Sequence, residues 1–322
     1  MFRRRAIFIL IIPALAWLGL SSRPGRPARM PARLQAGTAT VLPTSRPCEP
    51  QRIPETVLQS GDECLLNVAP RDHDPGRGCP EGWCGETALQ EALLYHGGYF
   101  PQKEINKAGR PSHPDLYSND IPVALDNLHV RYRSWPNDPP GLPAFLEWIR
   151  GQIKKGVPVF VGVKIYPTQH EDWGLDHFVN VAGFSTGKKE CFTFNTTWGL
   201  RETRTAEQLA STEKGYAFKN KHGRYYGISI TGPAAGKGAV GVRLFVLRET
   251  KDAMDVIVKC EGLTSQAEYV IHKSSSYGDQ GTPFAAFKAT GAAAGFYDTI
   301  DKKKAALYRC RIKDVPPAGG KG

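Results

Sequence analysis

The chain has 322 residues, of which 41% are hydrophobic, and its formal net charge is +11 at pH 7. This length accommodates one large domain or two medium ones, and we expect two. Residues 1–33 contain seven arginines and no acidic residue, which leaves a net charge of only +4 on the rest of the chain. Because that charge gathers into no basic patch with interleaved aromatic residues, we expect no nucleic-acid partner.

The N-terminus has the features of an export signal. It begins with a basic segment, continues with an apolar run and ends with small residues suited to cleavage. The apolar run is short for a membrane-spanning helix, which needs about 20 residues, and Pro13 interrupts it. We therefore predict a signal peptide over residues 1–22 and a linker over 23–55. The protein would be secreted, periplasmic or at the cell surface, where a retained signal would anchor it.

The cysteine content agrees with export, because disulfides form and persist in oxidising compartments. The seven cysteines are an odd number, so at least one thiol stays free, and we assign that role to Cys84. The remaining cysteines can form up to three disulfides, and these residues are Cys48, Cys64, Cys79, Cys191, Cys260 and Cys310. Cys260 with Cys310 is the expected pair, since both lie in predicted strands. A competing arrangement joins Cys84 to Cys79.

The first part of the first predicted domain, up to residue 155, is expected to be mainly helical. The segment before Cys84 has little periodicity and is rich in turn-forming residues. From Thr87 onward apolar residues recur at helical spacing, until Gly97 and the glycine after it end the helix. Two further helices are predicted over residues 117–128 and 142–155.

After Gly156 the pattern changes from helical to extended. Strands rich in Val, Ile and aromatic residues are predicted over residues 157–166, 176–184, 189–195 and 224–231. Helices followed by an antiparallel sheet are typical of an α+β domain, which we place at residues 56–232.

A glycine-rich linker separates this domain from a second, all-β domain at residues 242–315. Short strands are predicted over residues 242–248, 255–260, 268–273, 284–289 and 307–312. Their regular spacing is typical of a small β-sandwich, loosely similar to fibronectin-type domains. This domain is a candidate for contact with a cell surface or an extracellular matrix.

Cys84 lies where a loop becomes a helix. The unpaired backbone N–H groups and the positive end of the helix dipole at such a position favour the thiolate, which is the nucleophilic form. A cysteine used only for packing gains nothing there, and the alternative is that Cys84 is a buried or disulfide-bonded cysteine. We therefore predict that Cys84 is a nucleophile in the first turn of a half-buried helix.

A thiolate nucleophile needs an imidazole partner, and the imidazole needs a third group that fixes its tautomer. His177 begins a predicted apolar strand and Asn195 ends the next one. One imidazole nitrogen would face the sulfur, and Asn195 would hold the other. The alternatives are a histidine packed in the core and an N-glycan on Asn195, which begins an Asn-Thr-Thr sequon.

These motifs resemble those of the papain-like cysteine peptidase superfamily. The run Leu-Asp-His-Phe-Val-Asn-Val-Ala-Gly-Phe around His177 and the run Asn-Thr-Thr-Trp-Gly from Asn195 are similar to the His and Asn segments of that superfamily. The Cys-Gly pair at Cys84, with Tyr-His-Gly-Gly later in the same helix, is closest to the branch that processes bacteriocin leaders at double-glycine sites. The resemblance covers residues 56–232.

The resemblance implies a papain-like α+β fold and a triad in which Cys84 is the nucleophile, His177 the general base and acid, and Asn195 the orienting residue. It implies that the protein hydrolyses peptide bonds of a peptide or protein substrate through a thioester, without a cofactor or a metal. Three tryptophans near the motifs are expected to bind substrate side chains: Trp83, Trp173 and Trp198.

The chain departs from the family pattern in two ways. Family members usually carry a glutamine shortly before the cysteine as an oxyanion donor, whereas here Asn67 or Gln59 would have to fold back to supply one. The Asn195 motif is also one residue longer. Two other functions therefore stand beside the peptidase: a thiol acyltransferase that uses the same triad, and a surface-binding protein without catalytic activity.

Overall fold

The computed structural model describes residues 45–73, 82–166, 168, 173–218, 224–233 and 239–313. All of these residues belong to one compact unit. The predicted signal peptide, the predicted linker up to residue 44 and Cys79 lie outside the described residues. Within the described part of the chain, no helix is both long and apolar enough to cross a membrane.

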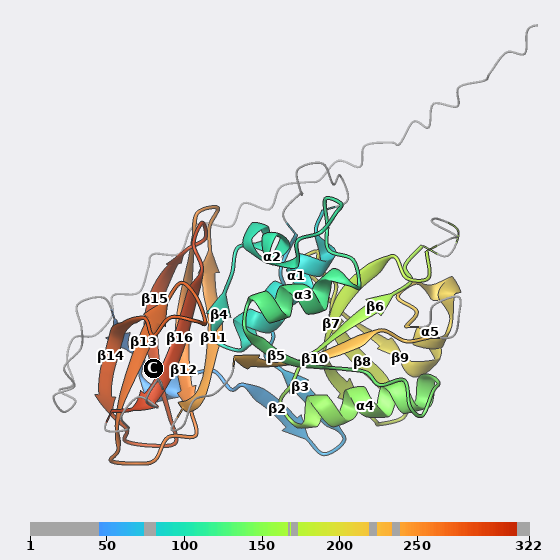
Figure 1. Cartoon of the computed structure of the whole chain (residues 1–322). Coiled ribbons are helices and arrows are strands. Elements are labelled where there is room, and N and C mark those ends of the chain that lie inside the picture. The colour runs from blue at the N-terminus through green and yellow to red at the C-terminus, as the bar shows by residue number, and fades with distance from the viewer. Residues whose placement is uncertain are drawn as a thin grey trace, which may run out of the picture. The chain divides into compact units, whose positions relative to one another are not determined.

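Eight antiparallel strands form the first sheet, in the order β2-β3-β7-β6-β10-β5, with β8 paired to β7 and β9 paired to β8 (Figure 1). The strands are β2 (Val57–Ser60), β3 (Glu63–Leu66), β5 (Val130–Ser134), β6 (Val159–Val163), β7 (His177–Ser185), β8 (Cys191–Asn195), β9 (Arg201–Thr205) and β10 (Gly227–Pro233). Strand β7 pairs with β6, β3 and β8. His177, its first residue, is therefore held by the most connected strand of the sheet.

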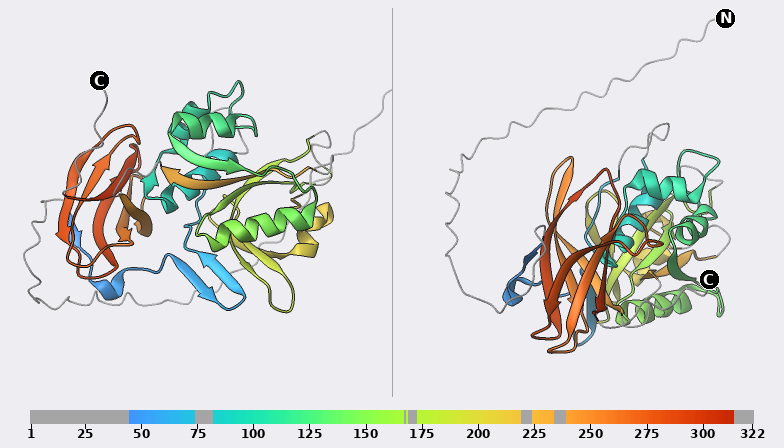
Figure 2. Two further views of the ribbon diagram at one scale, coloured as in Figure 1. Left: turned by 60° about the horizontal axis from the view of Figure 1, so that its bottom comes forward. Right: turned by 60° about the vertical axis from the view of Figure 1, so that its left-hand side comes forward.

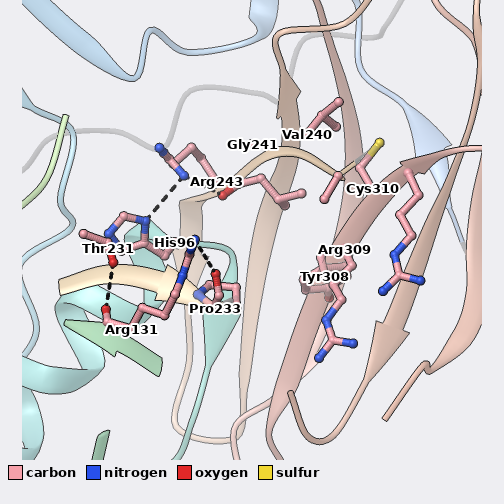
Figure 3. Close-up of a pocket in the computed structure, with 13 residues that line it drawn as sticks. His96, Arg131, Thr231, Pro233, Val240, Gly241, Arg243, Tyr308, Arg309 and Cys310 are labelled. Atoms are coloured by element: carbon pink, nitrogen blue, oxygen red, sulfur yellow. Dashed lines mark hydrogen bonds between the residues drawn. The ribbon is translucent and has the colours of Figure 1, made fainter. Parts of the chain in front are cut away.

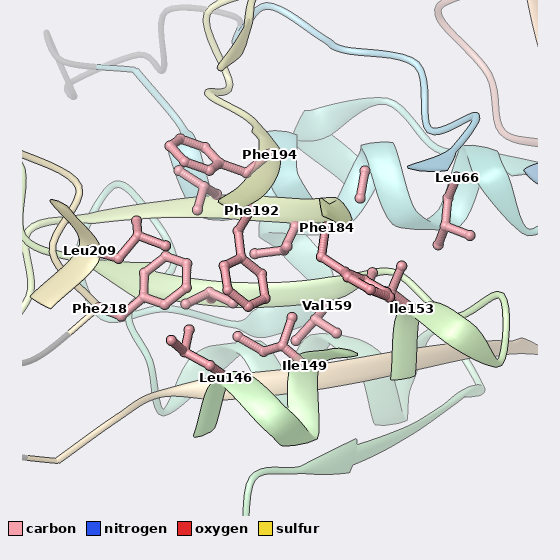
Figure 4. Close-up of a cluster of buried hydrophobic side chains, with 14 of the residues drawn as sticks. Leu66, Leu146, Ile149, Ile153, Val159, Phe184, Phe192, Phe194, Leu209 and Phe218 are labelled. Atoms are coloured by element: carbon pink, nitrogen blue, oxygen red, sulfur yellow. The ribbon is translucent and has the colours of Figure 1, made fainter. Parts of the chain in front are cut away.

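Five α-helices are present in the described residues: α1 (Cys84–Tyr95), α2 (Gln102–Gly109), α3 (Asp120–Asn127), α4 (Leu142–Lys154) and α5 (Ala206–Ala210). Helices lie on both faces of the first sheet. Side chains alternate between the two faces along each strand, and both faces carry apolar side chains that the helices cover. In β6, Val159 and Val161 face the core beneath α4, whereas Phe160 faces the core of α1 and α3. Figure 4 shows the first of these cores, in which Ile149 and Ile153 of α4 pack with phenylalanines from β7 and β8.

The second sheet also has eight antiparallel strands and curls around a separate apolar core (Figures 1 and 2). Its strands are β1 (Arg46–Pro47), β4 (Gly98–Tyr99), β11 (Ala239–Glu249), β12 (Ala253–Glu261), β13 (Glu268–Ser274), β14 (Thr282–Lys288), β15 (Ala293–Asp301) and β16 (Ala306–Ile312). Two of these strands come from early in the chain: β1 pairs with β15 and β4 pairs with β16. The described end of the segment predicted as a linker thus contributes a strand to this sheet.

Helix α1 is buried along its whole length from Gly85 to Tyr95, rather than on one face as predicted. Its residues Leu89 and Leu93 pack in the core shared with α3, while Leu94 packs in the core of the second sheet. The helix therefore lies between two apolar cores, which explains why it carries apolar residues on more than one face.

The predicted fold class, a helix-rich papain-like α+β domain followed by a small β-sandwich, is wrong. The described chain has sixteen strands and only five α-helices, and the strands form two curled antiparallel sheets. The helices predicted after Cys84 and over residues 117–128 and 142–155 are present as α1, α3 and α4. The error comes from strands that the sequence pattern does not reveal.

The missed strands are short or polar. β5 (Val-Arg-Tyr-Arg-Ser) and β9 (Arg-Glu-Thr-Arg-Thr) lie at the edges of the first sheet, where charged side chains reach water. β1 and β4 have two residues each, too few for any alternation to be visible. β15 begins Ala-Ala-Gly, a composition that predicts a loop better than a strand.

The six cysteines in the described residues are free thiols. Cys260 and Cys310, the predicted disulfide pair, are both buried in the core of the second sheet and are hydrogen-bond neighbours. No disulfide joins them in the structure, so the pairing stays a prediction.

The buried side chain of His96, which follows α1, should make the stability of the fold depend on pH. Its Nε2–H donates to the Ile230 carbonyl at 2.7 Å, and burial lowers its pKa to about 3 from the ordinary 6.5. Below pH 6.5 His96 is protonated in the unfolded chain but stays neutral in the folded one. The contribution of His96 to the free energy of unfolding is therefore fully present above pH 6.5 and is lost as the pH falls towards 3. We expect the loss of stability between pH 7 and pH 4 to be about 3 kcal/mol smaller in His96→Gln than in wild type.

Urea unfolding at pH 7 and pH 4 measures this effect. His129→Asn is the matched control, because His129 is exposed and its replacement should leave the pH dependence unchanged. Equal pH dependence in wild type and His96→Gln would show that His96 is not the group responsible.

Candidate active site

Cys84 begins α1 and is only partly buried, although the helix behind it is fully buried. The chain enters the helix through Gly82, whose φ of 84° favours glycine. A Cβ atom at Gly82 would also overlap the ring of His73. The backbone N–H groups of Gly85 and Phe178 lie near the Cys84 sulfur and lower its pKa. Phe178 belongs to β7, so the sulfur lies beside the strand that carries His177.

The ring of His177 is held in one orientation and one tautomer. Its Nε2 lies 3.0 Å from the carbonyl oxygen of Thr196 and 3.0 Å from Oγ1 of Thr197. Since the carbonyl only accepts and the Thr197 hydroxyl donates to that same carbonyl, Nε2 carries the hydrogen of the neutral ring. Nδ1 makes no hydrogen bond to another described residue and is left as the basic nitrogen.

Cys84 and His177 line one cavity of about 470 Å³. Five aromatic side chains line it, Tyr117, Trp173, Phe178, Tyr225 and Tyr226, together with two aspartates and one arginine. No hydrogen bond joins the Cys84 sulfur to the His177 ring, whose polar contacts are with Thr196 and Thr197. The structure therefore places the predicted nucleophile and base in the same cavity, without a direct contact between them.

Both groups are neutral at pH 7 in this structure. Burial raises the pKa of Cys84 to about 12, and the nearby carboxylates of Glu86 and Asp115 add to the effect, against the two backbone N–H groups that lower it. Burial also lowers the pKa of His177 to about 4. The helix N-terminus was expected to favour a thiolate, but the loss of water around the sulfur outweighs it.

Asn195 does not contact His177. Its Nδ2 donates to the Val68 carbonyl at 3.2 Å, and its Oδ1 accepts from Nε of Arg201 at 3.0 Å. It lies near Glu91, a buried residue of α1, and lowers the pKa of that carboxyl. Since Asn195 is fully buried, it offers no acceptor for an N-glycan in the folded protein. Its place is next to Thr196, whose carbonyl does orient the imidazole.

Glu91 of α1 is fully buried near Asn195. One of its carboxyl oxygens accepts the backbone N–H of Arg71 at 2.9 Å, whereas the other has no hydrogen-bond partner among the described residues. The nearby amides of Asn180 and Asn195 lower its pKa. Burial raises the pKa of Glu91 to about 8. The Arg71 guanidinium pairs with the carboxylate of Glu249 on β11, with 2.7 Å between Nη2 and Oε1. This ion pair connects these polar residues to the second sheet.

The three predicted substrate-binding tryptophans have three different positions. Trp173 lines the cavity and is 45% exposed. Trp198 stacks on the His177 ring, with centroids 4.4 Å apart and planes 14° from parallel. Trp83 donates from Nε1 to the Pro114 carbonyl at 2.9 Å and is not among the cavity residues. Only Trp173 is thus placed to meet a ligand directly.

Neither of the two predicted oxyanion donors reaches the cavity. Nδ2 of Asn67 donates to the Glu55 carbonyl at 3.3 Å, and Nε2 of Gln59 contacts the Cys64 sulfur at 3.8 Å. The donors that are present near the Cys84 sulfur are the backbone N–H groups of Gly85 and Phe178. Backbone N–H groups in such a place are suited to stabilise a developing negative charge.

Thr197 is the residue that sequence reasoning missed at this site. Its φ of 68° is left-handed, which is uncommon for a β-branched residue and is often found at functional sites. The sequence did contain a signal for Thr197, namely the additional residue in the Asn195 motif. With this residue, Thr196 and Thr197 both lie at the His177 ring. Glu91 gave no signal, since a glutamate in a helix is usually exposed.

A scan against known protein families finds no match for this chain, and no curated protein matches it. Among the described residues, no cluster of His, Cys, Asp and Glu side chains is arranged to hold a metal ion.

Proposed function

We propose that this protein is a cysteine-type hydrolase that cleaves peptide bonds through a thioester on Cys84. The observation that carries the proposal is that His177 lines the cavity of Cys84 while Thr196 holds its Nε2–H, which leaves Nδ1 as the basic nitrogen. Backbone N–H groups of Gly85 and Phe178 near the sulfur, and the aromatic side chains that line the cavity, support it.

In the first step the Cys84 sulfur attacks the peptide carbonyl carbon while its proton passes to Nδ1 of His177. A C–S bond forms and the carbonyl electron pair moves to oxygen. When this pair returns, the C–N bond breaks and the leaving amine takes the proton from His177. Water then adds to the thioester, with His177 as base, and the carboxylic acid leaves as Cys84 regains its proton.

The neutral resting state decides the order of proton transfer. Because the pKa of Cys84 is about 12 and that of His177 about 4, no thiolate–imidazolium pair exists before the substrate binds. The proton therefore moves during the attack, by general base catalysis. Activity requires neutral His177, so it should rise as the pH increases through about 4 and persist at neutral pH.

The test uses p-nitrophenyl acetate, an activated acyl donor that needs no specific binding site. We expect a burst of p-nitrophenol of one equivalent per protein and an acetyl group on Cys84 by mass spectrometry. In His177→Gln the rate of the burst should fall about 10²–10⁴-fold, because the general base is lost. Cys191→Ser is the control, since Cys191 lies on β8 and not among the cavity residues.

Two other results would change the conclusion. An unmodified Cys84, or equal burst rates in wild type and His177→Gln, would overturn the proposal and favour a binding protein without activity. If peptide thioesters are consumed faster when glycine peptides are added, and form new amide bonds, the protein is an acyltransferase that uses the same two residues.

A further inference from the structure

A second cavity, away from Cys84, lies at the junction of the two sheets (Figure 3). Its volume is about 240 Å³. Four arginines and one histidine line it, with no aspartate or glutamate among the lining residues: Arg131, Arg243, Arg309, Arg311 and His96. We call it the arginine cavity.

The fold brings these arginines together from three strands. Arg309 and Arg311 are two residues apart on β16, on the face opposite Cys310, whose side chain is buried in the core of the second sheet. Arg243 comes from β11 and Arg131 from β5, at the edge of the first sheet. The concentration of charge thus arises only when both sheets are folded.

Little negative charge compensates these arginines. The nearest carboxylate of Arg243 is Glu261, at 3.8 Å from its Nε, and Glu261 pairs more closely with Lys259 at 2.9 Å. Nη2 of Arg131 donates only to the Pro233 carbonyl, at 3.1 Å. The guanidinium of Arg311 makes no hydrogen bond or ion pair with another described residue, although its backbone pairs with β13 and β11.

The other two basic groups do not relieve the charge. Arg309 donates to the backbone carbonyls of Tyr277 and Asp279. The carboxylate of Asp279 also raises the pKa of Arg309, but by less than burial and Arg311 lower it. The Nδ1 atom of His96 lies 3.5 Å from Nη1 of Arg243 and accepts from it. The neighbouring guanidinium of Arg311 contributes to lowering the pKa of Arg309, after burial. Like charges that line one cavity repel each other, and an anion between them would remove this cost.

We propose that the arginine cavity binds a tetrahedral dianion, the phosphoryl or sulfuryl group of a small ligand. Guanidinium groups suit this chemistry, because each presents planar N–H donors that match two oxygens of one oxyanion. The volume is below the roughly 300–1,000 Å³ of sites for drug-sized ligands, so it fits an anionic headgroup better than a whole nucleotide. The site is independent of the reaction at Cys84.

Isothermal titration calorimetry of the full chain with sodium phosphate and, separately, sodium sulfate tests this proposal at ionic strength held constant with chloride. We expect one site per chain in wild type, with a Kd of about 1 mM or lower for at least one of the two anions. The ratio of the two affinities distinguishes a phosphoryl from a sulfuryl ligand. No heat above the dilution control with either anion would overturn the proposal.

Arg311→Gln and Arg131→Gln should each weaken binding at least about tenfold, because each removes charge-assisted hydrogen bonds. Arg248→Gln is the matched control. Like the other two changes it removes one positive charge, but Arg248 is exposed on β11 and pairs with Asp255 outside the cavity. Far-UV circular dichroism confirms that each variant is folded. Equal affinity in all three variants would show that the anion binds elsewhere, and Cys84→Ser should bind like wild type whether or not the protein is an enzyme.

Discussion

Replacing Cys84 by serine is expected to lower the rate of peptide hydrolysis by about 10⁴-fold or more. A serine hydroxyl is far less acidic than a thiol, so His177 with a pKa of about 4 is too weak a base to take its proton. The replacement also removes the polarizable sulfur near the backbone N–H groups of Gly85 and Phe178. Burst kinetics with p-nitrophenyl acetate, followed by peptide-product analysis, measure the loss.

The serine variant needs a thiol control and a fold control. Cys191→Ser serves as the first, because it removes a half-buried thiol from β8 and should keep full activity. Unfolding by urea serves as the second, since an isosteric change at a partly exposed position should alter stability by less than about 1 kcal/mol. Activity that survives in Cys84→Ser would show that the nucleophile is another group.

Replacing Phe160 by alanine is expected to destabilise the protein by about 3–5 kcal/mol. Phe160 is fully buried in β6, between the sheet and helices α1 and α3. Its ring lies 4.8 Å from that of Phe178 and 6.2 Å from that of Tyr226, centroid to centroid. The loss combines the transfer of the ring to water with the cavity left between these aromatic residues.

Urea unfolding at pH 7 measures the free energy of unfolding for this variant. Leu247→Ala is the control, because Leu247 is 51% exposed on β11 and its replacement should cost less than about 0.5 kcal/mol. Because the backbone N–H of Phe178 lies near the Cys84 sulfur, Phe160→Ala should also make Cys84 more accessible to iodoacetamide. A loss below about 1 kcal/mol would contradict the central packing role of Phe160.

The local elements around the site follow from the sequence. The apolar spacing after Thr87 and the glycines at the end of the run predict α1, and the aliphatic stripe of α4 is visible in the same way. The strand that begins with His177 is predicted by its apolar, β-branched composition. These elements depend on residues close together in the chain, so the sequence pattern is enough to find them.

Placement in space required the tertiary structure. Sequence reasoning placed Cys84 and His177 together, and the two line one cavity. It assigned Asn195 to the imidazole, but Arg201 and Val68 engage that amide, and Thr196 and Thr197 hold the ring instead. Which of several neighbouring polar groups reaches a ring depends on backbone angles such as the left-handed φ of Thr197, which residue spacing does not encode.

The sequence by itself determined where the proposed nucleophile and base lie along this chain, and which helix and strand carry them. Only the tertiary structure decided their protonation, the fold class and the arginine cavity. The physical reason is the same for all three. Desolvation of Cys84 and His177, pairing of polar edge strands such as β5, and convergence of Arg131 with Arg311 all depend on contacts between segments far apart in sequence.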